Sequence, residues 1–286
     1  CYHGSNDLYV FFEDGEIGFL NRAYLQFDNL LDRWFSRYAL NIRIGQFIPD
    51  FIPFAIHRGF MSTTYLTNST GFGGAVQDPF EVYGSLEQSQ RGMEFKGIIN
   101  HRFQYVIGVV NGNGIPKESE SENFDNNNDK DFYGRVAYKR GGMSLDGYLP
   151  ESEDDELNEM PNRKDNSIMV GIFGYKGKAR SVSAWDMILP DRFTRLGFDI
   201  DAYVGRFNIF GAFVRSKDTY FSDAGTVLSK SSSQAHPDDL HNPGTRNDKF
   251  YTWFVETDAM LYPWFLGGLR YEALDPPGGS TIKRIV

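Results

Sequence analysis

The chain has 286 residues and a formal net charge of -9 at pH 7, an acidic balance that disfavours a nucleic-acid partner. Aromatic residues make up 16% of the sequence and glycine occurs 30 times, a mixture that favours strands and tight turns. The mean hydropathy of -0.43 argues against a membrane protein built from helices. It remains compatible with a β-barrel, because only every second residue of a spanning strand needs to be apolar.

No stretch approaches the roughly 18 consecutive apolar residues of a transmembrane helix, so any membrane crossing would use strands. Cys1 is the single cysteine, which excludes an intrachain disulfide and a cysteine zinc cluster. The opening CYHGSNDLYVFF lacks the basic region and long apolar core of a signal peptide. We expect residues 1–7 to be a tail or the remnant of a preceding segment, and residues 8–286 to form the main structure.

Alternation of apolar and polar residues predicts the first strands. Every second residue is apolar in RAYLQFDNL, residues 22–30, and in LNIRIG, residues 40–45. The stretch RGMEFKGIINHRFQYVIGVV, residues 91–110, predicts two such strands joined as a hairpin. An extended chain with this period has one apolar side and one polar side.

The same alternation continues along the rest of the chain. DFYGRVAYKRGGMSLDGYL, residues 131–149, predicts another hairpin, and RFTRLGFDIDAYVGRFNIFGAFVR, residues 192–215, predicts two strands. KFYTWFVETDAMLYPWFLGGLRYEALD, residues 249–275, predicts a further pair. The final IKRIV is expected to open one more strand. We count about a dozen candidate strands and expect more in the complete barrel.

The predicted connections are unequal in length. Residues 112–130, 150–166 and 216–248 are polar and rich in Asp, Glu, Ser and Asn. Short turns on one side and long polar loops on the other are typical of an outer-membrane barrel. We therefore predict an all-β, antiparallel transmembrane β-barrel. Its tight turns are expected at Asn100-His101, Gly141-Gly142, Gly205-Arg206 and Tyr262-Pro263.

Charged residues recur on the polar side of these strands. For a single strand, the solvated face of a soluble sheet is the simpler interpretation. Repetition over many strands favours an aqueous lumen lined by both signs of charge. The residues predicted to face this lumen are Arg43, Glu94, Lys96, Arg102, Arg135, Lys139, Arg195, Asp199, Asp201, Glu256, Asp258, Arg270 and Glu272.

One loop resembles a calcium site in its spacing. Asp125, Asn127, Asp129 and Asp131 stand at alternate positions, as ligands do in calcium loops. Position six is Lys130 instead of glycine, and no glutamate follows at position twelve, so a plain acidic loop is the alternative. The sequence contains no Gly-x-Ser-x-Gly, His-Glu-x-x-His or phosphate-loop motif, and we do not expect an enzyme.

Several segments resemble a known family in their order along the chain: YVFFEDGEIGFLNRAYLQFDNLL, LNIRIGQFIPDF, RGMEFKG, FQYVIGVVNGNG and NFDNNNDKDFYGRVAYK. They are similar to outer-membrane porins that accompany, or are fused to, c-type cytochromes in extracellular electron transfer, and more distantly to phosphate-selective porins. The resemblance covers most of residues 8–140. It implies a barrel in the lipid of the bacterial outer membrane that either conducts small solutes or insulates a haem protein crossing the membrane. In the second case, the partner would be a monohaem or multihaem c-type cytochrome.

The resemblance also implies where the haem would be. The barrel itself is expected to bind no cofactor, and haem c would belong to the partner or to a preceding segment. Haem-bearing members of the family carry a Cys-x-x-Cys-His motif before the barrel, and this sequence has none. Cys1 and His3 have the wrong spacing for covalent attachment and are at most a remnant of such a motif.

Three functions follow as hypotheses. The first is the insulating barrel of a porin-cytochrome electron conduit. The second is a passive diffusion porin in which Arg43, Arg102, Arg135 and Lys139 bias the charge of small, anionic solutes. The third is a soluble all-β binding module.

Overall fold

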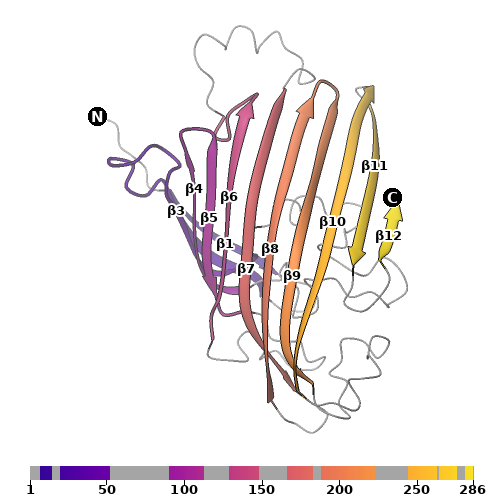
Figure 1. The fold of residues 1–286 in the computed structure, drawn as a ribbon. Helices are drawn as coiled ribbons and strands as arrows, with labels where there is room; N and C mark the ends of the chain where they lie inside the picture. Colours follow the sequence, from indigo (N-terminus) through magenta and orange to yellow (C-terminus); the bar gives the residue numbers. More distant parts are fainter. Residues whose placement is uncertain are drawn as a thin grey trace.

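The computed structural model describes residues 7–14, 20–51, 90–112, 129–147, 166–182, 188–222, 244–262, 264–275 and 281–285. These segments form one antiparallel sheet with its connecting turns (Figure 1). The prediction of an all-β, antiparallel fold is confirmed. Across these segments, no helix has the length and apolar character needed to cross a membrane.

Within the described residues, the sheet has twelve strands, which lie side by side in the order of the sequence. The strands are β1 (Asp7–Asp14), β2 (Leu20–Asp28), β3 (Asn41–Phe47), β4 (Gln90–Ile99), β5 (Phe103–Val110), β6 (Asp131–Gly141), β7 (Ser167–Val182), β8 (Ile188–Val204), β9 (Phe207–Ser222), β10 (Gly244–Tyr262), β11 (Phe265–Asp275) and β12 (Ile282–Ile285). The terminal strand predicted from IKRIV is present and pairs with β11.

The sheet is curved but open. In Figure 1, β7 to β10 run lengthwise across the view, and the sheet turns toward the back through β1 to β4. In the part of the chain that the structure describes, β1 pairs only with β2, and β12 only with β11. The described strands therefore form a curved wall with two free edges.

The central strands are long. β7, β8, β9 and β10 contain 16, 17, 16 and 19 residues. A strand rises about 3.3 Å per residue, so strands of this length extend roughly 50–60 Å. About 9–11 residues suffice to cross the hydrocarbon core of a membrane. These strands are long enough to cross a bilayer and to extend beyond it.

Two of the predicted tight turns have the expected left-handed backbone. Asn100 and His101, between β4 and β5, have φ values of 50° and 62°. Positive φ at both central residues is the signature of a type I′ hairpin turn, which matches the twist of its strands. Gly205, between β8 and β9, has φ 62°. Both turns, and the turn between β10 and β11, lie at the same end of the antiparallel sheet.

The hairpin predicted at Gly141-Gly142 is wrong. β6 ends at Gly141, which pairs with Ser167 of β7, and the described residues 142–147 that follow Gly141 are not a strand. Arg102 donates hydrogen bonds to the carbonyl oxygens of Gly141 at 2.7 Å and Gly142 at 2.8 Å, which holds the chain in a turn. The long connection from β6 to β7 leaves from the same end as the tight turns. The end of the sheet that has the tight turns therefore also has a long connection, so the two ends differ less clearly in connection length than predicted.

Residues on one side of the sheet form its core. We call this side the inner face; it is defined by the aligned positions of Glu94, Tyr133, Tyr175 and Arg195, and the opposite side is the outer face. Aromatic rings stack along the inner face, with ring centroids 6.0 Å apart for Tyr133 and Tyr175. The buried apolar cluster comprises Phe47, Phe51, Val106, Val110, Tyr133, Phe173, Tyr175, Phe193, Phe210, Ala212, Val214 and Phe254.

Gly108 allows an inner-face ring to cross its strand. Glu94, Gly108 and Tyr133 are neighbours on β4, β5 and β6, and the Tyr133 hydroxyl donates to the Glu94 carboxylate at 2.6 Å. A Cβ at Gly108 would lie 2.1 Å from the Tyr133 ring. We expect Gly108→Ala to displace this ring and to lower the free energy of unfolding by about 1.5–3 kcal/mol, the contribution of a hydrogen bond to a charged group.

Denaturant titration checks this expectation against Gly134→Ala as the matched control. A Cβ at Gly134 meets only the Val106 carbonyl oxygen, at 3.2 Å, which requires a much smaller adjustment. Equal stability of the two variants would contradict the role assigned to Gly108.

Candidate functional site

The two faces of the sheet reverse the usual arrangement of a soluble protein. Ile172 on the outer face is 62% exposed, whereas Asp199 on the inner face is 1% exposed. The exposed outer-face side chains include Ile107, Phe132, Ile172, Leu196, Phe198, Ile200, Val255 and Leu269. The buried charged side chains of the inner face are Arg43, Glu94, Arg135, Arg195 and Asp199. The candidate site is therefore the inner face, where the polar groups gather.

Glu94 is the centre of the first polar cluster. Arg43 of β3 is its cross-strand neighbour and donates from Nη2 to the Glu94 carboxylate at 2.6 Å. The Tyr133 hydroxyl and the backbone N–H of Asp50 donate to its other oxygen, at 2.6 Å and 2.9 Å. The carboxylate is fully buried, at 0% exposed. These three donors compensate the loss of water around its charge.

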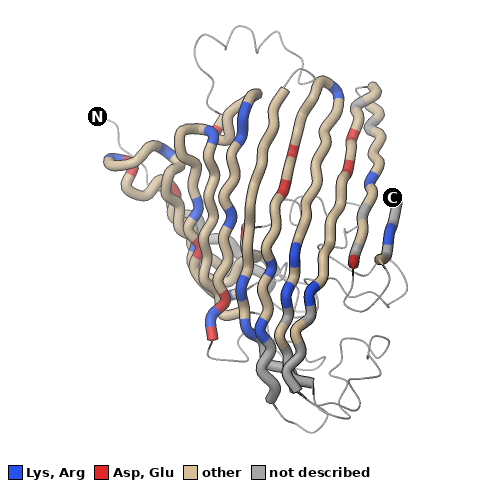
Figure 2. Tube along the Cα trace, in the orientation of Figure 1, with Lys and Arg blue, Asp and Glu red and all other residues tan. Residues whose placement is uncertain are grey.

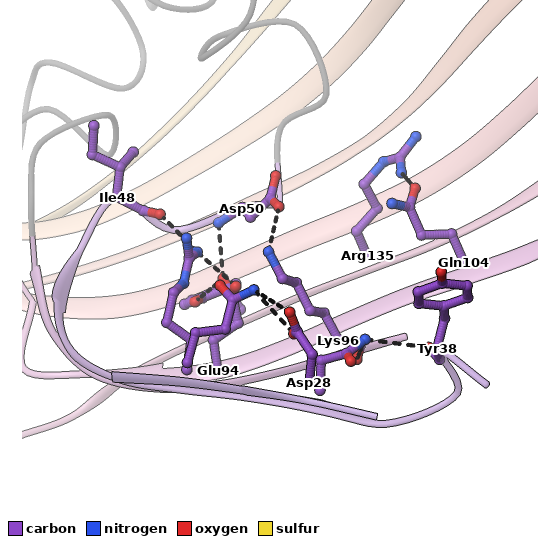
Figure 3. A network of polar contacts seen from close by, with 12 residues as sticks. Asp28, Tyr38, Ile48, Asp50, Glu94, Lys96, Gln104 and Arg135 are labelled. Carbon is purple, nitrogen blue, oxygen red and sulfur yellow. Dashed lines mark hydrogen bonds and ion pairs between the residues drawn. The ribbon is translucent and has the colours of Figure 1, made fainter. Parts of the chain in front are cut away.

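The chain after β3 turns over the inner face. Arg43 donates to the carbonyl oxygen of Ile48 at 3.1 Å, and Asp50 pairs with Lys96 at 3.5 Å. Figure 3 shows Asp50 linked to both Glu94 and Lys96. Phe51 follows, 1% exposed, and packs against rings of β6 and β7. Its ring centroid lies 5.3 Å from that of Tyr133 and 5.3 Å from that of Tyr175.

Phe51 is expected to anchor this segment. Because the side chain fills a closed aromatic cluster, Phe51→Ala should lower the free energy of unfolding by about 3–5 kcal/mol. Hydrogen exchange should then show faster exchange at the Asp50 amide. Phe35→Ala is the matched control, since Phe35 is 54% exposed and should tolerate the change. Unchanged protection at Asp50 would show that other contacts hold the segment.

A second cluster spans four strands, β5 to β8. Arg135 of β6 donates from Nε and Nη2 to the two carboxylate oxygens of Asp199 on β8, at 3.1 Å and 2.7 Å. It also donates to Gln104 of β5 at 2.9 Å. Gly171 of β7 lies between them, and a Cβ there would meet Asp199 at 2.5 Å. The absent side chain at Gly171 leaves room for a two-point ion pair across β7.

The pairing of charges continues toward β11. Glu256 and Arg270 are cross-strand neighbours and form an ion pair. Asn208 donates to Asp201 at 2.9 Å. Arg195 lies over the Phe193 and Phe250 rings, with its guanidinium carbon 5.3 Å and 5.2 Å from their centroids. The charged side chains of Glu256, Arg270, Asp201 and Arg195 therefore contact partners that belong to the same sheet.

All but one of the residues predicted to face a lumen lie at inner-face positions of the strands. The exception is Arg102, which lies in the β4–β5 turn and donates to backbone carbonyl oxygens, so its prediction as a lumen-facing residue stays untested. At Glu272 the register places the residue opposite Phe254, on the inner face. Whether this face encloses water stays a prediction. The other predicted residues all occupy inner-face positions: Arg43, Glu94, Lys96, Arg135, Lys139, Arg195, Asp199, Asp201, Glu256, Asp258 and Arg270.

The calcium-loop prediction is only partly covered by the structure. Asp125 and Asn127, like Cys1 and His3, lie outside the described residues. Asp131 accepts hydrogen bonds from the Tyr175 hydroxyl at 2.8 Å and from the Lys178 backbone at 3.0 Å, and Asp129 pairs with Lys178. In the described segments, no three His, Cys, Asp or Glu side chains come close enough to hold a metal ion. Calcium binding therefore stays a prediction.

A comparison of the chain with family models, curated proteins and solved structures finds no match. The functional argument therefore starts from the geometry of the two faces. The inner face presents buried charges, of which Arg43 is paired with Glu94 and Arg135 with Asp199. The outer face presents an extended apolar surface, a kind of surface that often marks a contact with a protein or a membrane.

Proposed function

We propose that the chain is a transmembrane β-barrel protein of the bacterial outer membrane, whose sheet forms the wall of a passage. The observation that carries this proposal is the outward exposure of large apolar side chains opposite a buried, charged inner face. A soluble antiparallel sheet would turn its apolar side toward the core and its charged side toward water. A lipid neighbour makes the observed arrangement favourable on both sides.

The height of the apolar surface supports the proposal. On β8, outward positions are apolar from Leu196 to Val204. At about 3.3 Å per residue this stretch is roughly 26 Å long, which spans a height of about 20 Å at the strand tilt of about 35–45° in outer-membrane barrels, most of their apolar band of about 25 Å. Tyr262 and Trp264 stack at the β10–β11 turn, with ring centroids 5.4 Å apart. Aromatic pairs in this position suit the interface between lipid and water.

Closure of the wall is part of the proposal. The open edges at β1 and β12 would expose unpaired backbone groups, which the hydrocarbon core does not tolerate. In the barrel these edges pair with each other or with further strands. The barrel's ends are expected to face different compartments, with the tight turns of β4–β5, β8–β9 and β10–β11 at the same end.

Within this proposal, the barrel insulates a c-type cytochrome that carries electrons across the membrane, as the family resemblance implies. The barrel contributes a low-dielectric wall, and haem c belongs to the partner. The pairing of two inner-face arginines with carboxylates favours an insulating wall over a solute-selective pore. Arg43 is paired with Glu94 and Arg135 with Asp199, so these two cations do not present a free positive field.

A passive diffusion porin is the second candidate. The observation in its favour is the partial exposure of inner-face polar residues on β8, β10 and β11. Asp201, Asp258 and Arg270 are less buried than Glu94 and Asp199, as residues bordering a water-filled space would be.

The native protein, extracted from membranes in mild detergent, tests both candidates. A folded barrel should migrate differently in detergent gels before and after boiling, which a soluble sandwich rarely does. During size-exclusion chromatography, a stoichiometric Soret band that co-elutes with the protein supports the conduit. A folded but colourless barrel that conducts ions in planar bilayers would favour the diffusion porin instead.

A further inference from the structure

The outer face changes character toward one end of the central strands. Lys and Arg gather near the lower ends of β7 to β10 in Figure 2. Lys176, Thr194, Lys217 and Lys249 are consecutive cross-strand neighbours on the outer face. Arg192 and Arg215 occupy outer-face positions beside this row. The five basic residues are exposed, and we call them the basic rim: Lys176, Arg192, Arg215, Lys217 and Lys249.

The signs of charge are segregated between the faces of these strands. β7 contains no acidic residue among its described positions. On β8, β9 and β10, every acidic residue stands at an inner-face position in the register: Asp191, Asp199, Asp201, Asp218, Asp248, Glu256 and Asp258. Among the described residues of β7 to β10, outer-face positions therefore carry cations and no acids; the acid beside them, Asp129, pairs with Lys178, which is not counted in the basic rim. Ordinary surface strands mix both signs, so this one-sided field indicates an anionic neighbour.

The basic rim directly borders the apolar surface. Along β9, Phe213 is the last apolar outward residue before Arg215 and Lys217. Along β10, the outward residues Tyr251 and Trp253 follow Lys249. Lysine and arginine have apolar stems that lie along a hydrophobic surface while their charged ends reach the water interface. The cations are thus placed at the level of lipid headgroups if the apolar surface lies in hydrocarbon.

We infer that the basic rim binds the phosphate groups of anionic membrane lipids that surround the barrel. This inference rests on the proposed function, because it places the rim at one edge of the apolar band. A nucleic acid would also be attracted to cations. The adjoining exposed side chains of Leu196 and Trp253, with the half-buried Phe213, favour a ligand that offers phosphate and hydrocarbon together, which is a lipid. The guanidinium group of arginine binds phosphate through hydrogen bonds of fixed geometry, and the ammonium group of lysine binds it as a point charge.

Electron paramagnetic resonance with spin-labelled lipids tests the inference. The full chain is reconstituted in phosphatidylcholine bilayers containing a trace of spin-labelled phosphatidic acid or spin-labelled phosphatidylcholine. Lipids in contact with a transmembrane protein give a motionally restricted signal. We expect phosphatidic acid to associate at least about threefold more strongly than phosphatidylcholine, with the preference falling as salt increases.

The triple variant Lys176→Gln/Lys217→Gln/Lys249→Gln should lose most of this preference. Arg140→Gln is the matched control, because Arg140 is exposed at an outer-face position of β6 near the opposite end of the sheet. Heat-modifiable migration of each variant confirms that it remains folded. A preference that survives in the triple variant, or that falls equally in the control, would overturn the inference.

The outcomes separate the inference from the proposed function. A restricted signal that is equal for both lipids would overturn the binding site and leave the transmembrane barrel standing. The complete lack of a restricted signal would overturn the barrel itself. Stronger binding of a short RNA than of phosphatidic acid, abolished by the triple variant, would replace lipid by nucleic acid as the ligand of the rim.

Discussion

Replacing Ile172 with lysine is expected to destabilise the inserted protein by about 2–4 kcal/mol, the cost of a lysine on the lipid face near the bilayer midplane. Ile172 is central on the outer face, between Val136 of β6 and Phe198 of β8. The physical reason is the transfer of an ammonium group from water into hydrocarbon. Urea titration of the protein folded into phosphatidylcholine vesicles measures the loss.

The same substitution separates lipid from water as the neighbour of this face. On a soluble protein, a lysine at a position as exposed as Ile172 should change stability by no more than about 0.5 kcal/mol. Phe35→Lys is the control, since Phe35 is exposed in the connection between β2 and β3, outside the strands. If Ile172→Lys were as well tolerated as Phe35→Lys, the outer face would not lie in lipid.

Removing Arg135 is expected to destabilise the protein by about 3–5 kcal/mol, because Asp199 would keep a buried and unpaired charge. The side chains of this pair are 4% and 0% exposed, so water does not replace the lost partner. Arg135→Met preserves much of the side-chain length while it removes the charge. The measurement is the same urea titration, with the wild-type protein as reference.

The double variant Arg135→Met/Asp199→Leu tests whether the pair acts as a unit. Replacing both members of a buried ion pair with apolar groups is often neutral or stabilising, so most of the lost stability should return. Additive losses from the two substitutions would mean that each residue contributes through other contacts. The stability of the inner face would then depend less on ion pairing than the distances indicate.

The alternation of side chains was enough to predict the faces of most strands. β8 shows why. Its apolar residues Leu196, Phe198 and Ile200 alternate with glycine and aspartate, and alternate residues of an extended chain lie on opposite sides. The pattern is blurred in β7, where Ile172 faces outward and Phe173 faces inward. Both sides of β7 are apolar because its inner side joins the aromatic cluster, so its period was not evident.

The partners within the inner face could not be predicted from the sequence. Arg43 and Glu94 are 51 residues apart, and Arg135 and Asp199 are 64 residues apart. Their pairing depends on the register of neighbouring strands, which alternation within each strand does not specify. Gly108 and Gly171 gave a usable signal, since a glycine within a strand often marks the close approach of another group. The group that approaches each glycine is known only once the strands are aligned.

Two placements that the sequence did not predict have a common physical origin. Arg102 follows the alternation of β5, yet it lies just before the strand begins, where free carbonyls of the neighbouring connection are within reach. Gly141 and Gly142 have the composition of a hairpin, but the chain pairs at Ser167 instead of at the next residues. Both cases were decided by contacts between segments distant in the sequence. Turn composition alone does not specify such contacts.

Nitroxide scanning along β8 tests the central claim most directly, namely that the outer face lies in lipid and the inner face does not. Cys1 is the only cysteine, so Cys1→Ser gives a background for single cysteines at Leu196, Phe198, Ile200, Asp201 and Tyr203. In vesicles, the spin labels at the first three positions should collide with oxygen and be shielded from a water-soluble nickel complex. The labels at Asp201 and Tyr203 should show the opposite preference. Equal access of the nickel complex to both sets would contradict the claim and place both faces of the sheet in water.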